Sequence, residues 1–386
     1  MNILKDINNI DGIKALTAKG GEIFLVGGIV RDSFLNKESK DIDLIVRLLE
    51  IDVIEKILLP HGFVKKDVGK SFSVIKFIPK GWTKEPIDIA LPRTEKKIDI
   101  GHKGFKIDAN PFLEIEEDLI RRDITINSIA ISLKDGRVID PFNGISDIKN
   151  KLIKATSNQS FIEDPLRILR VIQFASRFDF DIEDETFDLI LKNVQSLDEI
   201  SGERITTELD KIFTKGDIQK GFKLLKDSKV LKQITGSEPI DFQLDSKITR
   251  SEFFFLLFQG SHSPESIFEK RLNGDVDTIK GIKALNIFRN KFTTDLSEIE
   301  KRFLMVELIT KSNDVLNFSI LKGLETEITQ FRNKEFPSKI TDLAINGDIL
   351  MNKGLKGKEI GDKLKLLLFE VLQGKKKNII EDLLND

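Results

Sequence analysis

The sequence predicts an α+β protein in which a mixed α/β head is followed by helices alone. Within residues 1–148, short apolar runs that end at glycine, proline or charged residues alternate with segments of helical spacing. From residue 149 onward, apolar residues recur at the three- and four-residue intervals of amphipathic helices. The chain has 386 residues, of which 40% are hydrophobic, and this is enough to bury more than one core. We therefore expect a globular protein of several domains.

Strand character is found in five short stretches of the head. They are rich in branched apolar residues, and several alternate between apolar and polar positions. In chain order they are Glu22–Val26, Asp41–Val46, Ser71–Ile78, Pro86–Leu91 and Arg137–Ile139. Between them, helical spacing predicts helices over Ile29–Phe34 and Asp118–Ile131.

The remainder of the chain has the pattern of successive helices. The candidates are Phe161–Phe178, Phe187–Val194, Arg204–Phe213, Phe222–Leu225 and the densely apolar Phe253–Phe258, which we expect to be a buried helix. Two further helix-like stretches, punctuated by glycines, follow Gly347. We predict four segments, namely a head over residues 1–148, a helical neck over 149–215, a helical body over 216–340 and a helical tail over 341–386.

Composition argues against several classes of function. The absence of cysteine removes disulfides, thiolate metal sites and a cysteine nucleophile, and three scattered histidines argue against a histidine-rich metal centre. The 61 basic and 63 acidic residues give a net charge of -2, so a nucleic-acid surface would have to be local. Neither a membrane span of roughly 18–20 apolar residues nor an apolar signal core is seen. We expect a cytoplasmic protein that does not contact a membrane.

A glycine turn stands between the first predicted strand and the helix that follows it. The segment Gly27–Asp32 has the sequence GGIVRD. Gly27 and Gly28 let backbone N–H groups approach an anion, and the start of a helix favours negative charge. Arg31 is placed to reach a phosphate oxygen. A phosphate-binding turn is one interpretation, and an ordinary tight turn is the other.

Two aspartates begin the next predicted strand. Asp41 and Asp43 are separated by one residue, so their side chains share a face of the strand. Two carboxylates so close together favour a cation between them, and such a pair beside a phosphate-binding turn suits two-metal phosphoryl transfer. Asp88, in another alternating strand, is the candidate for a third carboxylate. The alternative is a solvated sheet edge with exposed aspartates.

These features resemble the first sequence motif of the class II tRNA nucleotidyltransferases, which are the bacterial and eukaryotic CCA-adding enzymes, and of bacterial poly(A) polymerases. Segments similar to the later motifs follow in the family's order. They are Arg121–Asn127 (RRDITIN), Asp140–Asp147 (DPFNGISD, with Asn143 where glycine is common), Glu163–Arg170 (EDPLRILR) and Ile200–Leu209 (ISGERITTEL). The segments Ile345–Asp348, Gly354–Gly357 and Ile360–Gly361 resemble the family's C-terminal tail less specifically.

The resemblance implies a DNA-polymerase-beta-like nucleotidyltransferase palm followed by an all-helical neck, body and tail. It also implies an enzyme that adds CCA to the 3′ end of tRNA without a template, with CTP and ATP as donors, Mg²⁺ as cofactor and pyrophosphate as the leaving group. Asp41 and Asp43 would hold the metal ions, with help from Asp88. The nucleotide phosphates would lie against Gly27, Gly28 and Arg31.

The resemblance further implies that the EDPLRILR segment selects the nucleotide. Asp164 and Arg167 would read the Watson–Crick edge of cytosine or adenine in place of a template, and Arg170 would support the nucleotide near its phosphates. Arg122 and Asp123 resemble the ribose and phosphate contacts of the second motif. Without the resemblance, the same side chains have the pattern of helix-surface ion pairs and a helix cap.

Three further expectations depend on the resemblance. Gln173 stands where the family often has another arginine, so part of the triphosphate clamp is expected to be weaker or to come from elsewhere. Asp140 and Asp147 are expected to brace the junction of head and neck and not to touch substrate. The polar, glycine-punctuated segment Arg93–Asn110 resembles the family's flexible loop, which favours full CCA or A addition over CC addition, although an ordinary surface loop has the same composition.

RNA is expected along the helical body. Candidate phosphate contacts are Lys223, Lys226, Lys353, Lys356, Lys358 and Lys375–Lys377. Other functions stay open, among them an A-adding or CC-adding member of a split pair and a bacterial poly(A) polymerase. A palm that binds RNA without catalysis is a more distant alternative, against which the acidic pair argues. A small-molecule nucleotidyltransferase of the antibiotic-modifying type would usually have G-S in place of G-G.

Overall fold

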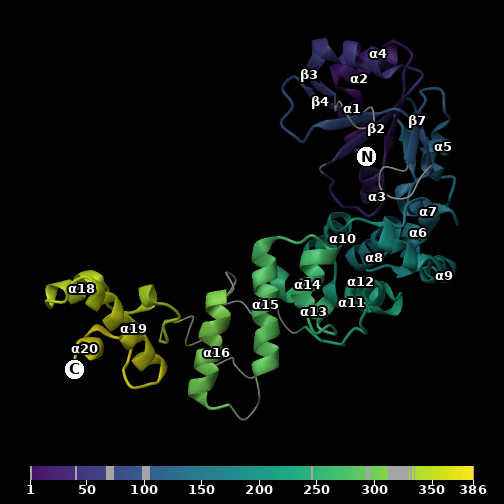
Figure 1. Cartoon of the computed structure of the whole chain (residues 1–386). Helices are drawn as coiled ribbons and strands as arrows, with labels where there is room; N and C mark the ends of the chain where they lie inside the picture. The colour runs from purple at the N-terminus through teal and green to yellow at the C-terminus, as the bar shows by residue number, and fades with distance from the viewer. Residues whose placement is uncertain are drawn as a thin grey trace. The chain divides into compact units, whose positions relative to one another are not determined.

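The computed structural model of the chain describes residues 2–39, 41–66, 74–97, 105–244, 247–292, 296–311, 330, 333 and 335–385. They form two compact units, Met1–Val230 and Leu231–Asp386 (Figure 1). All strands among the described residues belong to the first unit, and the described elements of the second unit are helical. The prediction of an α+β head followed by helices is confirmed.

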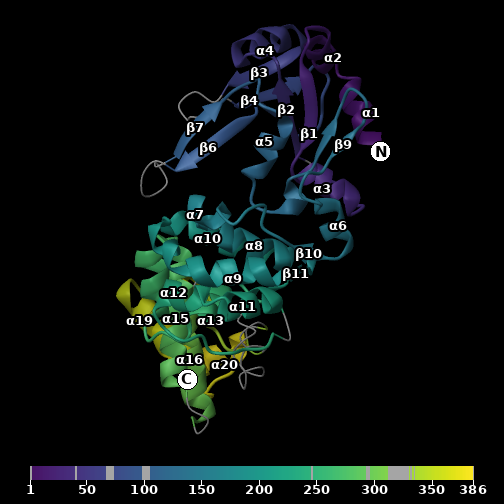
Figure 2. The ribbon, with the colours of Figure 1, turned by 90° about the vertical axis from the view of Figure 1, so that its right-hand side faces the viewer.

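A seven-stranded mixed sheet forms the scaffold of the head (Figure 2). Its strands are β1 (Glu22–Val26), β2 (Ile42–Arg47), β3 (Gly62–Lys66), β4 (Val74–Pro79), β5 (Ile87–Ala90), β8 (Ala130–Ser132) and β9 (Val138–Ile139). Their order across the sheet is β3-β4-β5-β2-β1-β8-β9. Strand β1 is antiparallel to both of its neighbours, β2 and β8, whereas β2 and β5 run parallel. The parallel register sets Asp43 directly opposite Asp88.

One face of this sheet packs against α5 (Ile115–Ile120). Phe24 and Val26 of β1 share that face because strand side chains alternate, and they join Leu119 in a single buried cluster. Helix α3 (Gly28–Phe34) begins almost directly after β1. The β1–α3 turn therefore lies at the end of a largely buried strand, as the glycine pair predicts.

Helices α2 (Asp11–Ala18) and α4 (Ile51–Leu58) pack together beside β4. A Cβ atom on Gly12 would lie only 2.7 Å from the ring of Phe77, so glycine at this position permits the helix to approach the strand closely. Helix α1 (Asn2–Asn8) and the 3₁₀ turn η1 (Leu59–His61) contact α2.

The segment Arg93–Asn110 contains a hairpin and is not simply a loop. Strand β6 (Arg93–Lys97) pairs antiparallel with β7 (Phe105–Ala109) in a separate two-stranded ribbon. Strand pairing uses backbone groups, so the polar side chains that suggested a loop are compatible with it. The glycine-punctuated centre of the predicted flexible loop, residues 98–104, lies outside the described residues.

The prediction of a single helix over Asp118–Ile131 is wrong. This segment contains the end of α5, the 3₁₀ turn η2 (Thr125–Asn127) and the start of β8. Tertiary hydrogen bonds override the helical spacing here, because the backbone N–H of Thr125 donates to the Lys154 carbonyl over 2.9 Å. The helix predicted over Phe161–Phe178 is also divided, at a proline that follows a residue of extended backbone conformation.

The rest of the first unit is built mainly from helices. They are α6 (Gly144–Lys149), α7 (Ser160–Glu163), α8 (Leu166–Phe178), α9 (Asp184–Asn193), α10 (Gly202–Lys215) and α11 (Ile218–Asp227), with the 3₁₀ turn η3 (Val194–Glu199) and the parallel pair of β10 (Leu152–Ile153) and β11 (Asp181–Ile182). Helix α8 packs against both α10 and α11. Because most of its side chains are buried, α8 is held as a rigid support.

The second unit is helical throughout its described elements. They are α12 (Val230–Thr235, which starts at the boundary), α13 (Arg250–Phe258), α14 (Pro264–Ser266), η4 (Ile267–Arg271), α15 (Val276–Lys291), α16 (Glu298–Lys311), η5 (Ile340–Asp342), α18 (Gly347–Asn352), α19 (Lys358–Leu372) and α20 (Ile380–Leu384). The buried helix expected over Phe253–Phe258 is confirmed in α13. The tail contains three helices after residue 346, one more than predicted. Among the described residues, no helix has the length and apolar character needed to cross a membrane.

Candidate active site

A polar cavity of about 510 Å³ lies within the first unit, between the sheet and α8. Residues from the β1–α3 turn, β2, β5, the segment after α5 and α8 line it. Seven arginines and four aspartates are among these residues, so the lining carries an excess of positive charge suited to an anionic ligand.

The cavity brings together ten of the eleven residues that the sequence singles out. They are Gly27, Gly28, Arg31, Asp43, Asp88, Arg122, Asp123, Asp164, Arg167 and Arg170. Asp41 is exposed just before β2 and is not among the described residues that line the cavity. Its charge nevertheless acts on Asp43, so the two carboxylates lie near one another. The individual roles of all these residues stay predictions.

The glycine turn lies close to charged side chains of the cavity. Gly27 has a φ of +76°, which is a left-handed conformation that glycine adopts without strain. A Cβ atom there would lie 3.2 Å from Oδ2 of Asp43 and 3.5 Å from Nη1 of Arg122. At Gly28 a Cβ atom would lie 3.4 Å from Nη2 of Arg31. The two glycines therefore let the backbone come close to both the carboxylate and the arginines.

The carboxylates at the ends of β2 and β5 repel one another. Burial raises the pKa of Asp43, and the charges of Asp88 and Asp41 raise it further, while Arg122 and Lys76 act in the opposite direction. Lys76 Nζ donates to both carboxylate oxygens of Asp88, at 3.0 and 3.2 Å. A cation would relieve the repulsion on Asp43, as the lysine already does for Asp88.

The donor set suits Mg²⁺ better than a metal that needs a closed cage. Within the described residues, no three acidic or imidazole side chains gather as a ready-made metal site. Mg²⁺ is commonly held by one or two carboxylates, with water and substrate phosphates completing its octahedron. Asp43 and its acidic neighbours fit that pattern.

Helix α8 contributes the opposite side of the cavity. Arg167 is buried, and it donates from Nη1 to the Ser160 hydroxyl at 3.1 Å and from Nη2 to the Arg121 carbonyl at 2.6 Å. Asp164 lies just before the helix and is paired with Arg204 Nη2 at 3.0 Å. Both side chains are thus fixed before any ligand binds.

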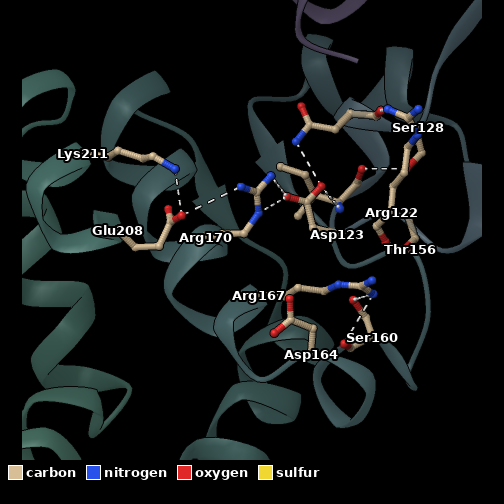
Figure 3. Close-up of polar contacts among 12 residues, drawn as sticks. Arg122, Asp123, Ser128, Thr156, Ser160, Asp164, Arg167, Arg170, Glu208 and Lys211 are labelled. Atoms are coloured by element: carbon tan, nitrogen blue, oxygen red, sulfur yellow. Dashed lines mark hydrogen bonds and ion pairs between the residues drawn. The ribbon is translucent and has the colours of Figure 1, made fainter. Parts of the chain in front are cut away.

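A second network on α8 centres on Arg170. Its Nη2 lies 2.6 Å from Oδ2 of the buried Asp123, and a carboxylate oxygen of Glu208 lies 3.9 Å from its Nη1 (Figure 3). The carboxylate of Asp123 raises the pKa of Arg170. Burial alone would raise the pKa of Asp123, but Arg170 and the Asn127 amide lower it overall. Asp123 therefore orients Arg170. The predicted contact of Asp123 with ribose would have to form while this ion pair is kept.

Arg31 is the most enclosed cation of the site. Its side chain donates to Asp32 from Nε at 2.8 Å and to Asn127 from Nη1 at 2.5 Å. Burial lowers the pKa of Arg31, an effect that Asp32 opposes. The guanidinium also lies over the rings of Phe174 and Phe178, at 5.3 and 4.7 Å from their centroids.

Several important residues were missed by reasoning from the sequence. Asp118 is fully buried and pairs with Arg122 Nη2 at 3.1 Å. The sequence D-x-x-R-R could have indicated this pair, because it places an arginine one helical turn after the aspartate. Asn127 joins Arg31 to Asp123 from within the RRDITIN segment. Arg204, in the last of the five motifs, orients Asp164.

Other predicted residues lie outside the cavity lining. Asp140 accepts hydrogen bonds from the backbone N–H groups of Gly144 (2.7 Å) and Ile145 (2.9 Å), and so caps α6. Asp147 accepts a hydrogen bond from Thr125 Oγ1 at 2.6 Å. Both contacts lie within the predicted head, so the bracing of the head–neck junction stays a prediction. The lysines proposed as RNA contacts stay a prediction.

Comparison with known proteins gives the site its context. Residues 23–154 match the family described as the poly(A) polymerase head domain. Residues 179–236 match the family described as the probable RNA- and SrmB-binding site of polymerase A. These two stretches of the chain are thus similar to the head domain and to the RNA-binding region of poly(A) polymerases. The first match contains the glycine turn and the acidic strands, and α8 lies between the two matched regions.

Curated relatives resemble about half of the chain. A multifunctional CCA protein of Pseudoalteromonas atlantica is 38% identical over 216 residues, which are 55% of this chain and 50% of that protein. The chain thus spans about half the length of the curated relatives it matches.

Solved structures match nearly the whole chain. A CCA-adding enzyme in complex with ATP is 25% identical, with a TM-score of 0.70, and the match covers 99% of this chain and 92% of that chain. A Thermotoga maritima CCA-adding enzyme complexed with tRNA has a TM-score of 0.71 at 24% identity, with 99% and 93% coverage. The second likeness shows the fold alone.

Proposed function

We propose that this chain adds CCA to the 3′ end of tRNA without a template, with CTP and ATP as donors and Mg²⁺ as cofactor. The observation that carries the proposal is one cavity that joins the Asp43 carboxylate and the glycine turn to the Asp164–Arg167 pair of α8. Nucleotidyl transfer needs the first group, and selection of a base without a template needs the second. The names of the relatives support the same reaction.

In the proposed reaction, the 3′ hydroxyl oxygen of the RNA attacks the α-phosphorus of the nucleotide. The bond from that phosphorus to the oxygen bridging it to the β-phosphorus breaks, and pyrophosphate leaves. Bound Mg²⁺ would lower the pKa of the attacking hydroxyl and neutralise developing charge. Asp43 and Asp41, assisted by Asp88, would hold the ion, and the turn at Gly27 and Gly28 would admit the phosphates.

Arg122 has a donor ready for the nucleotide. Its Nη2 is anchored on Asp118, and its buried Nε has no hydrogen-bond partner within the described part of the chain. A buried N–H without an acceptor costs free energy, so an oxygen of the ribose or a phosphate would be favoured there. We therefore assign Arg122 to binding the sugar–phosphate part of the donor.

Asp164 and Arg167 would select the base. A carboxylate accepts from the amino group of cytosine or adenine, and a guanidinium donates to a ring nitrogen or carbonyl. Their anchors, Arg204 and Ser160, hold them on a rigid helix end before the nucleotide arrives. Such preorganisation allows protein side chains to replace a template strand.

Product length tests the function directly. We expect the full chain to extend tRNA lacking CCA by CC with CTP alone, to add A to tRNA ending in CC with ATP alone, and to complete CCA with both nucleotides. Sequencing gels of the labelled RNA measure this. Addition of A alone or CC alone would indicate a split-pair enzyme, a long A tract on unrelated RNA would indicate a poly(A) polymerase, and binding without extension would support an RNA-binding palm.

Substitution of Arg204 should reduce base selectivity more than turnover. In Arg204→Ala the carboxylate of Asp164 loses its ion-pair partner, which lies 3.0 Å away, and is held less firmly, by the Leu166 backbone N–H at 3.2 Å from Oδ1. We expect CTP and ATP to lose roughly 10-fold in kcat/KM relative to UTP and GTP, since a misplaced polar contact costs about 1–3 kcal/mol. Steady-state kinetics with each nucleotide measures the ratio. An equal fall for all four would contradict this role for Arg204.

A further inference from the structure

One face of α8 presents a row of side chains to the cavity. Arg167, Arg170, Phe174 and Arg177 all line it, and their spacing of three and four residues is that of a single helical stripe. Ten residues separate Arg167 from Arg177, which is roughly 15 Å along the helix axis. The stripe therefore extends well beyond the base-selecting end and reaches another part of the cavity.

Arg177 lies at the end of the cavity that contains Arg31. Both guanidinium groups lie over the same ring, that of Phe178, at 5.0 and 4.7 Å from its centroid. Phe178 is stacked on Phe174, with 5.8 Å between the ring centroids and 6° between their planes. The two aromatic rings thus hold two cations together on the cavity wall.

The two cations differ in how their charge is balanced. Arg31 is paired with Asp32, whereas no acidic side chain is recorded against Arg177 within the described residues. Burial lowers the pKa of Arg31, and the charge of Arg177 contributes in the same direction. Two guanidinium groups that repel each other beside a cavity favour an anion between them.

The neighbouring position on α8 does not supply this charge. Gln173 is neutral, 2% exposed, and absent from the described lining of the cavity. Its amide nitrogen has no hydrogen-bond partner among the described residues. Arg177 is therefore the cation of α8 that serves the far end of the stripe.

We propose that Arg177 binds the β- and γ-phosphates of the nucleoside triphosphate, and with them the departing pyrophosphate. This inference rests on the proposed function, because it places the donor with its base at Asp164 and Arg167. The triphosphate then extends along α8 toward Arg31 and the glycine turn. Arg177 of α8 and Arg31 of α3 together bind its terminal phosphates.

A structural role for Arg177 has to be separated from this one. The residue occupies the last turn of α8, where a cation stabilises the helix end, and it also covers an aromatic ring. Loss of either contact would lower stability without regard to the ligand. The decisive readout is therefore a comparison of ligands that differ only in their phosphates.

The experiment measures binding to the full chain by calorimetry, with Mg²⁺ present and no RNA. The ligands are CTP, CMP and inorganic pyrophosphate. In Arg177→Ala we expect CTP and pyrophosphate to bind roughly 10- to 100-fold more weakly, because a hydrogen bond to a charged group is lost, while CMP binds as to the parent. Arg177→Lys keeps the charge but loses the paired N–H donors of the guanidinium group. We expect its affinities for CTP and pyrophosphate to lie between those of the parent and of Arg177→Ala.

Lys37→Ala is the matched control. Lys37 lies 5.1 Å from the centroid of the same Phe178 ring but lines a different cavity, so its removal should leave all three affinities unchanged. Equal weakening of CTP and CMP in Arg177→Ala, or an unchanged CTP affinity, would overturn the inference. Failure of tRNA extension would count against the proposed function alone, since the ratio of CTP to CMP affinity does not depend on RNA.

Discussion

Asp43→Asn should abolish nucleotide addition while leaving the fold and RNA binding intact. Asp43 lies beside the glycine turn and opposite Asp88 on the parallel strand. An amide cannot supply the charge that a divalent ion needs, so we expect kcat to fall at least about 1,000-fold, given that metal stabilisation supplies several kcal/mol. Primer-extension assays with labelled tRNA measure the loss, and a mobility-shift assay measures RNA binding.

A matched control separates this effect from a general loss of negative charge. Asp135 is an exposed aspartate between β8 and β9 of the same sheet and does not line the cavity, and Asp135→Asn should extend tRNA at the parent rate. Asp41→Asn tests the second proposed ligand, for which we expect a comparable loss. Normal addition by Asp43→Asn would refute the assignment of the metal site.

Asp43→Asn should also stabilise the folded chain at neutral pH when no divalent ion is present. Because the pKa of Asp43 is raised in the folded chain, the stability that its protonated form contributes is lost as pH rises through the folded pKa. At neutral pH without divalent ions, Asp43→Asn should therefore melt at a higher temperature than the parent. Mg²⁺ should raise the melting temperature of the parent but not of the variant, and calorimetry measures both.

Local patterns predicted the parts of the site that are close together in sequence. The turn at Gly27 and Gly28, the strand that carries Asp43 and the alternation around Asp88 all follow from glycine chemistry and a period of two. The helical spacing of Arg167 and Arg170 in EDPLRILR agrees with α8, whereas Asp164 lies before that helix in extended backbone. All of these features depend on the conformation of residues that are close together in sequence.

Tertiary contacts decide the rest, and these could not be predicted from the sequence. The position of Asp43 opposite Asp88 depends on parallel pairing of β2 with β5, strands that are not consecutive in the chain. The helix predicted through Thr125 fails because distant backbone groups capture its hydrogen bonds. Arg177 has no local signal that separates it from a solvated helix-end cation. The four-segment division of the chain stays a prediction.

Asp118→Asn should destabilise the first unit and weaken catalysis together. The Asp118 side chain is 0% exposed and pairs with Arg121 at 2.5 Å and Arg122 at 3.1 Å. Asp118→Asn removes a buried counter-charge that Arg121 and Arg122 share, and breaking a buried ion pair typically costs about 3–5 kcal/mol. We expect a fall in melting temperature on the order of 10 °C and a higher KM for nucleotides, because Arg122 loses its anchor. Thermal denaturation and steady-state kinetics measure the two effects.

The dependence on pH distinguishes the buried ion pair from simple loss of packing. Burial alone would raise the pKa of Asp118, but Arg122 and Arg121 lower it overall. Its contribution to stability is therefore present above the ordinary aspartate pKa and lost as pH falls through the lowered value in the folded chain. The stability difference between parent and Asp118→Asn should be constant near neutral pH and shrink in acid.

As a control, Asp52→Asn removes an exposed pair with Lys66 and should leave the neutral-pH melting temperature unchanged. A difference between parent and Asp118→Asn that stays constant into acid would show that Asp118 acts through shape and not through charge.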